Sequence, residues 1–175
     1  MPWYFAYGSN MHSGTLRGRR GIEYQHAVPA RALGWRLVFD KPGLLPTGEG
    51  YANIIPDPAA ETYGVLFAVS DDDLAHIDLT EGVLIGNYRR VETPVLALAE
   101  PTPTSTAFTL TSHRRKQGVL PSTRYMALLI EGAIEHDLPA EYIAYLRTVP
   151  ARIESAVAAQ LRPFVDTLMK RPKTG

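Results

Sequence analysis

The sequence contains no cysteine and no long apolar run, and each absence removes a class of protein. Without cysteine the chain has neither a disulfide framework nor a thiolate nucleophile. No stretch approaches about 18 uninterrupted apolar residues, so we expect no membrane span. The N-terminus lacks a basic segment followed by a long apolar stretch, so we predict no secretory signal peptide. We therefore expect a globular, cytoplasmic protein.

Excess charge is also absent, because 18 basic residues balance 18 acidic ones. A net charge of zero argues against nucleic acid or a membrane surface as the main partner. The five histidines are scattered and show no metal-ligand spacing, so we predict no metal site. At 175 residues the chain is predicted to form a single domain, residues 1–175, that buries about 70 % of its unfolded surface.

Strand-like segments come first along the chain and helical patterns later. Strands are predicted at residues 3–7, 30–40, 51–55, 62–69, 88–99 and 105–111. Helices are predicted at residues 9–18 and 70–80, after Pro121, from Pro139, and from about Arg152 with a break or kink at Pro163. Residues 41–50 are predicted to form a loop, and Pro101 and Pro103 a turn. This order predicts an α+β fold: a small mixed, mainly antiparallel β-barrel or curled sheet with helices packed outside.

The segment Tyr7-Gly8-Ser9-Asn10 links a buried strand to a helix and is the first candidate site. A glycine there permits close approach of a ligand to the backbone. The free N–H groups of the helix's first turn then favour a carboxylate, a phosphate or a developing oxyanion. The alternative is an ordinary turn whose glycine serves sterics alone, and the pattern by itself favours that alternative. Ser9 is interpreted as a helix cap rather than a nucleophile, because no base can be assigned beside it.

Glu81 is the second candidate, at the predicted end of the helix that starts after Ser70. A carboxylate there faces the negative end of the helix dipole, and burial in a pocket would further favour its protonated form. Both effects suit a group that exchanges protons. The alternative is an exposed glutamate at a helix end, which the pattern alone favours.

Three motifs in the correct order resemble the γ-glutamyl cyclotransferase family. The run Tyr4-Phe5-Ala6-Tyr7-Gly8-Ser9-Asn10-Met11 resembles its N-terminal signature. Glu81-Gly82-Val83 followed by Gly86-Asn87-Tyr88 resembles the segment that carries its catalytic glutamate. A looser match joins Pro121-Ser122-Thr123-Arg124-Tyr125 to Gly132-Ala133, Leu138-Pro139 and Tyr142. The resemblance spans residues 3–146, and the departures lie around residues 41–50 and 101–103.

The resemblance implies an enzyme that cyclises a γ-glutamyl amino acid or amine to 5-oxoproline and releases the free amine, without a cofactor. It implies Glu81 as general acid and base, the Tyr7, Gly8, Ser9 and Asn10 loop as the binder of the γ-glutamyl group, and Tyr88 and Tyr125 as pocket residues. The expected partner is a small γ-glutamyl molecule, and the sequence is compatible with a homodimer. Glu81→Gln is expected to lower turnover at least about 10²–10⁴-fold while leaving stability unchanged or raised. Binding of the γ-glutamyl group should survive, because it is assigned to the loop.

Three alternatives stay open at this point. The nearest is the same chemistry on a γ-glutamylamine, such as a crosslink remnant or a biosynthetic intermediate. A second is a non-catalytic module of the same fold that binds a small molecule. A nucleic-acid-binding role would rest only on the basic cluster at residues 113–116, which is more often a solvated loop.

Overall fold

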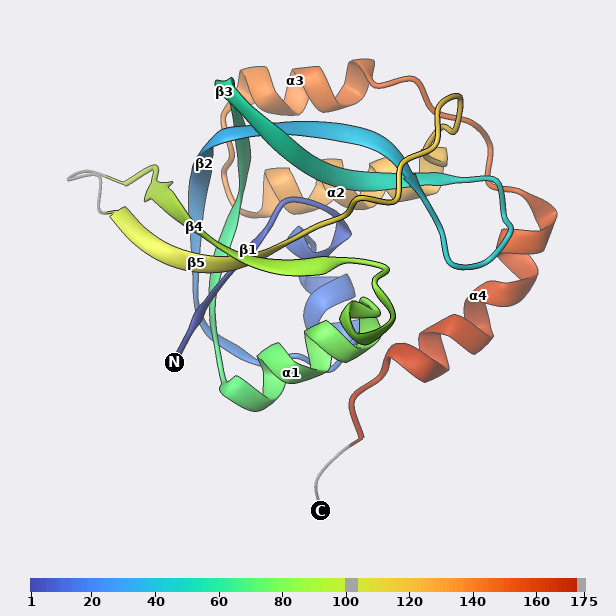
Figure 1. Ribbon diagram of the computed structural model, residues 1–175, viewed down its shortest axis with the longest axis horizontal. Coiled ribbons are helices and arrows are strands. Elements are labelled where there is room, and N and C mark those ends of the chain that lie inside the picture. The colour runs from blue at the N-terminus through green and yellow to red at the C-terminus, as the bar shows by residue number, and fades with distance from the viewer. Residues whose placement is uncertain (100–103, 173–175) are drawn as a thin grey trace.

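The chain forms a closed five-stranded barrel with helices outside it (Figure 1). The structure is a computed structural model, and it describes residues 1–99 and 104–172, so the predicted turn at Pro101 and Pro103 lies outside the described residues. The strands are β1 (Trp3–Ala6), β2 (Tyr24–Pro42), β3 (Gly50–Val69), β4 (Arg89–Ala97) and β5 (Thr104–Thr111). They follow the order β1-β3-β2-β4-β5, antiparallel at every pairing except the parallel contact of β1 with β5 that closes the barrel. The predicted fold class is confirmed.

The strands β2 and β3 are much longer than the sequence predicted, at 19 and 20 residues. Two segments expected to be separate, at 51–55 and 62–69, belong to one strand. Pro56 pairs with Trp35, and the next paired position is Glu61 with Leu33. The residues between them form a bulge, where a missing proline N–H does not interrupt the ladder.

Within the described residues, four α-helices surround the barrel, and a serine caps the start of three of them. They are α1 (Asp71–Thr80), α2 (Thr123–Glu135), α3 (Ala140–Thr148) and α4 (Ala156–Met169). Ser70, Ser122 and Ser155 each accept a backbone N–H from the third residue after them. These bonds satisfy donors that the first turn leaves free. No helix among the described residues has the length and apolar character needed to cross a membrane.

The start of α4 differs from its prediction. Arg152 is extended and bridges to Ser122, so the helix begins only at Ala156. Pro163 lies inside α4 without breaking it. The carbonyl that loses its partner to this proline belongs to Ala159, and both residues are exposed, so solvent can satisfy that carbonyl.

The helix predicted at residues 9–18 is two short irregular turns instead. A 3₁₀ turn, η1, covers Ser9–Met11, and a π-helical turn, η2, covers Gly14–Arg19. Gly8 takes the N-cap position and no side chain caps η1, so the interpretation of Ser9 as a cap is wrong. Packing against α2 shapes this segment, because a Cβ at Gly132 would lie 2.7 Å from the backbone nitrogen of His12.

Candidate active site

A cavity of about 500 Å³ opens between one end of the barrel and α4. It is lined by all seven residues that the sequence singled out: Tyr7, Gly8, Ser9, Asn10, Glu81, Tyr88 and Tyr125. The structure therefore brings together two motifs that lie more than 70 positions apart. The roles of these residues stay predictions.

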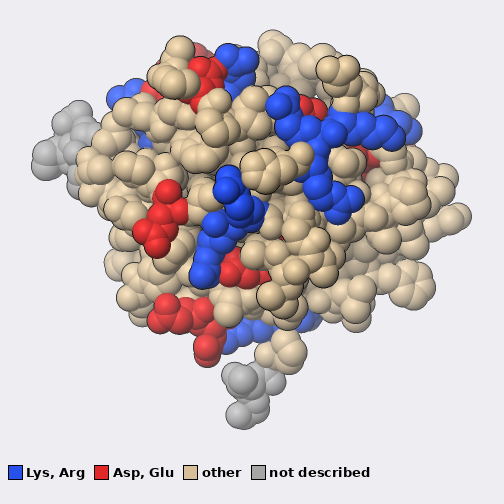
Figure 2. All heavy atoms as spheres, viewed as in Figure 1, with Lys and Arg blue, Asp and Glu red and all other residues tan. Residues whose placement is uncertain are grey.

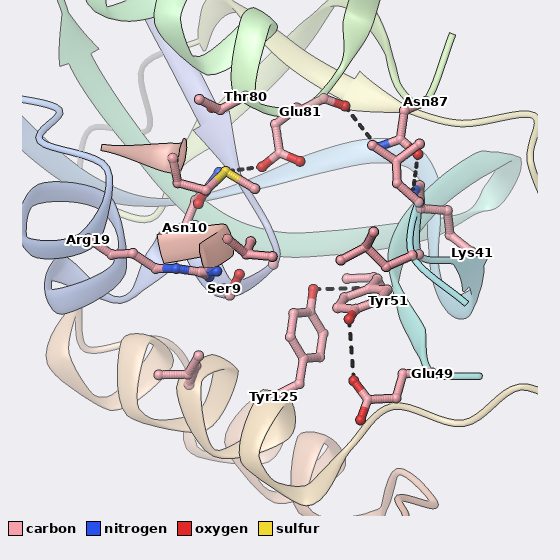
Figure 3. Close-up of a pocket in the computed structure, with 18 of the residues that line it drawn as sticks. Ser9, Asn10, Arg19, Lys41, Glu49, Tyr51, Thr80, Glu81, Asn87 and Tyr125 are labelled. Atoms are coloured by element: carbon pink, nitrogen blue, oxygen red, sulfur yellow. Dashed lines mark hydrogen bonds between the residues drawn. The ribbon is translucent and has the colours of Figure 1, made fainter. Parts of the chain in front are cut away.

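Glu81 is held by one of its oxygens and leaves the other to the cavity. It is the C-cap residue of α1, and Gly82 after it has φ 71°, the left-handed conformation predicted for the helix end. Oε1 accepts hydrogen bonds from Arg20 at 2.5 Å and from Asn10 at 3.2 Å. Among the described residues no group donates to Oε2. The side chain is 16 % exposed, and its carboxylate points into the cavity (Figure 3).

Arg20 is a site residue that the sequence did not indicate. It follows η2, its side chain is 5 % exposed, and its second nitrogen donates to the hydroxyl of Thr80 at 2.5 Å. A buried guanidinium favours an ionised carboxylate beside it. The sequence-based expectation considered only the helix dipole and burial, and it did not include the Arg20 guanidinium that pairs with Glu81.

The loop after β1 presents its backbone to the same cavity. Gly8 has φ −109°, which any residue can adopt, so its backbone conformation does not require glycine. The reason for a glycine here is the lack of space for a side chain. A Cβ there would lie 3.1 Å from the hydroxyl of Tyr125. Asn10 is buried, donates to the hydroxyl of Tyr4 at 3.0 Å, and its Oδ1 is buried without a partner among the described residues. The first amides of η1 have no acceptor within the turn.

The tyrosines are fixed by bonds to the backbone. Tyr7 donates to the carbonyl of Leu110 at 2.5 Å and Tyr88 to that of Ala52 at 2.8 Å, while Tyr125 accepts the N–H of Ala52 at 3.2 Å. Burial raises the pKa of Tyr125 far above its ordinary value, and burial raises that of Tyr88 as well. These hydroxyls stay neutral near pH 7, so they shape the cavity rather than act as bases.

Lys41 lines the cavity although the sequence assigned it only to a loop. It is 2 % exposed, and its Nζ donates to Oδ1 of Asn87 at 2.6 Å and lies 4.5 Å from the centre of the Tyr88 ring. Burial lowers the pKa of Lys41 to about 8, while nearby Glu81 opposes the shift. Asn87 in turn donates to the backbone carbonyl of Glu81 at 2.9 Å, so Lys41 supports the end of α1 through one amide side chain (Figure 3).

The basic cluster at residues 113–116 is partly occupied by contacts within the chain. Arg115 pairs with Asp40 at 2.6 Å, and Arg114 donates to Asn87 at 3.4 Å. On the face in Figure 2, acidic and basic side chains are interspersed. No group of three His, Asp or Glu side chains within residues 1–99 and 104–172 is arranged to hold a metal ion.

Comparison with known proteins agrees with this geometry. Residues 61–146 match the model of the AIG2-like family. The γ-glutamylcyclotransferase of Bos taurus is 31 % identical over 167 residues, which cover 93 % of this chain and 86 % of that protein. The γ-glutamyl cyclotransferase aclK of Aspergillus oryzae is 29 % identical over 170 residues, covering 84 % and 60 %. The chain belongs to the γ-glutamylcyclotransferase family.

A solved structure titled γ-glutamyl cyclotransferase shares this fold. It superposes with a TM-score of 0.77 over 95 % of this chain and 98 % of that one, at 24 % identity. The closed barrel with helices outside it is therefore the fold of a γ-glutamyl cyclotransferase. The resemblance drawn from the three sequence motifs is confirmed.

Proposed function

We propose that this protein is an enzyme that converts a γ-glutamyl amide into 5-oxoproline and a free amine. One observation supports the proposal above the others: Glu81 directs an unbonded carboxylate oxygen into the cavity that the Tyr7–Asn10 loop also lines. A single proton-accepting atom beside a row of backbone donors matches what this cyclisation needs.

The reaction forms one carbon–nitrogen bond and breaks another. At neutral pH the α-amine of the substrate is largely protonated and cannot attack. Oε2 of Glu81 takes a proton from it, and the amine then attacks the γ-carbonyl carbon to close a five-membered lactam. The tetrahedral intermediate expels the amide nitrogen as it receives this proton from Glu81. The attacking nitrogen then loses its second proton to Glu81, which leaves one N–H on the lactam, and the released amine takes up that proton and leaves as an ammonium ion. No oxidant or cofactor enters this balance.

Arg20 and Asn10 give the proton carrier its position. Because both bonds fall on Oε1, the carboxylate cannot rotate freely, and Oε2 stays directed at the substrate. The ion pair with Arg20 places a buried positive charge beside Oε1. Holding base and substrate in a near-attack geometry contributes to the rate as well.

We assign the binding of the γ-glutamyl group to the loop after β1. Backbone N–H groups of Gly8, Ser9 and Asn10 would bind that group and stabilise the oxyanion of the intermediate. Tyr88 and Tyr125 would form the walls that hold the folded substrate.

The test is incubation with γ-glutamyl dipeptides and a γ-glutamylamine, with 5-oxoproline and glutamate separated by mass. We expect 5-oxoproline, and no turnover of a substrate whose α-nitrogen is acetylated, because that nitrogen is the nucleophile. Glutamate as the primary product would indicate an amide hydrolase. Binding without turnover of any compound would indicate the non-catalytic module instead.

The same panel separates γ-glutamyl amino acids from γ-glutamylamines, which the family alone does not distinguish. The cytoplasmic location, the homodimer and the extent of the single domain, residues 1–175, stay predictions.

A further inference from the structure

The cavity has two chemically unlike walls. The wall around Glu81 is polar and includes Asn10, Arg20, Lys41 and Asn87. The other side includes leucine and valine side chains of α4 and of the loop between β2 and β3, beside charged groups that pair with one another, such as Arg162 with Glu154. The proposed chemistry uses only the polar wall.

One face of α4 is directed at the cavity. Ala158, Leu161, Val165 and Leu168 follow the three-to-four-residue spacing of a helix face, and all four line the cavity. On a helix outside a barrel such a face normally packs onto the core. Here α4 stands apart from α2 and α3, beside the open end of the barrel (Figure 1).

Polar contacts hold α4 in place instead. At its start the N–H of Ser155 donates to Oε1 of Glu49 at 3.2 Å. In its middle Asp166 pairs with Arg19. Beyond its end the N–H of Arg171 donates to the carbonyl of Arg20 at 2.9 Å. The apolar face of α4 is therefore free to meet a ligand.

Apolar side chains on other elements face the same space. Leu44 and Leu45, in the loop after β2, are 50 % and 42 % exposed, and Leu128 of α2 joins them in the lining. Apolar surface left open on both sides of a cavity gains free energy when a ligand displaces the water. A γ-glutamyl group is itself polar and no larger than one residue, whereas volumes of about 300–1,000 Å³ enclose whole small ligands.

We propose that this apolar wall is the site of the leaving group, and that the substrates are γ-glutamyl amides of amines or amino acids with a large apolar side chain. The proposal rests on the proposed function and specifies its substrate class. With the γ-glutamyl group at the polar wall, the departing amine lies between Glu81 and α4. Its side chain then contacts Leu161 and Val165.

The test compares two dipeptides that differ only in apolar bulk, γ-glutamylalanine and γ-glutamylphenylalanine. Apolar pockets discriminate by about 10- to 200-fold per methylene group at best. We therefore expect kcat/KM to favour the phenylalanine compound by about tenfold or more. Leu161→Ala and Val165→Ala should each lower kcat/KM for γ-glutamylphenylalanine several-fold more than kcat/KM for γ-glutamylalanine, and so reduce that preference. Leu161→Met, which keeps the apolar bulk of the side chain, should retain the preference for γ-glutamylphenylalanine.

The matched control is Phe164→Ala, which removes a large apolar side chain that is 71 % exposed on α4 and does not line the cavity. It should leave the preference unchanged. Equal turnover of both dipeptides, or an equal loss for both in Leu161→Ala, would overturn the leaving-group site and leave the proposed function standing. Absence of 5-oxoproline from every γ-glutamyl compound would instead refute the proposed function, and this inference with it.

Discussion

Replacing Glu81 by glutamine tests the site through activity and stability together. The variant keeps the size of the side chain but loses both its charge and its ability to take a proton. Its single oxygen can still accept from Arg20, whose side chain is 5 % exposed and cannot turn to solvent. Turnover and folding should therefore both respond, for different reasons.

The expected sizes follow from these contacts. General acid–base assistance contributes about 10²–10⁴-fold, so 5-oxoproline release should fall at least that far. Removing one partner of a buried ion pair costs about 3–5 kcal/mol when nothing replaces it. The uncharged amide oxygen of glutamine can still accept a hydrogen bond from Arg20, which offsets about 1 kcal/mol of this cost. We expect the free energy of unfolding to fall by about 2–4 kcal/mol, which replaces the expectation of unchanged or raised stability.

Three measurements on wild type and variant test the roles of Glu81 in turnover and stability: urea unfolding, a binding isotherm for a γ-glutamyl compound, and 5-oxoproline release. Asp78→Asn is the matched control, because Asp78 also lies on α1 and pairs with an arginine, Arg90, but that arginine is 39 % exposed. This control should change stability by less than about 1 kcal/mol and turnover by less than about twofold. A folded Glu81→Gln protein with near wild-type turnover would remove Glu81 from the mechanism. An unchanged free energy of unfolding would refute the energetic role given to Arg20.

Three further predictions concern Lys41 and two glycines. Between the lowered pKa of Lys41, about 8, and its ordinary value of 10.5, the unfolded chain keeps a proton that the folded chain has released, so stability rises with pH across that window. Lys41→Met should abolish about 3 kcal/mol of this rise in urea titrations, and a rise equal to that of wild type would contradict the assignment. Gly132→Ala should lower stability by about 1–3 kcal/mol, because its Cβ meets the backbone of η1, whereas Gly18→Ala, with nothing within 4 Å, should not, and equal melting of the two variants would refute this packing. Gly8→Ala, whose Cβ meets the Tyr125 hydroxyl at 3.1 Å, should lower kcat/KM at least tenfold in a chain that melts near wild type, and unchanged kinetics would remove the loop from the site.

The parts of the site that sequence reasoning predicted depend on local signals. Ser70 caps α1, and Gly82 ends it with a positive φ, so the position of Glu81 at the helix end follows from a dozen adjacent residues. The barrel's outline also followed from the order of strand and helix patterns. The joined β3 did not, because the bulge between Pro56 and Glu61 is set by pairing with β2 rather than by β3 alone.

Arg20 and Lys41 were missed because their partners are distant in sequence. Arg20 lies 61 positions from Glu81, and Lys41 lies 46 positions from Asn87. Neither arginine in a basic stretch nor lysine before a proline is an unusual local pattern. Only the closed barrel, which puts the end of β2 beside the end of α1, makes these cations buried and therefore important.

The helix α4 shows why a correct pattern can still leave function undecided. The spacing of Leu161, Val165 and Leu168 predicts an apolar helix face, and the structure has one. The pattern alone assigns such a face to the core, since that is where most apolar helix faces lie. What directs it to a cavity instead is the set of polar contacts at Ser155, Asp166 and Arg171, which fix the helix without using its apolar side chains. A helix fixed by polar contacts can keep its apolar face unfilled, and that unfilled face is the basis of the proposed preference among leaving groups.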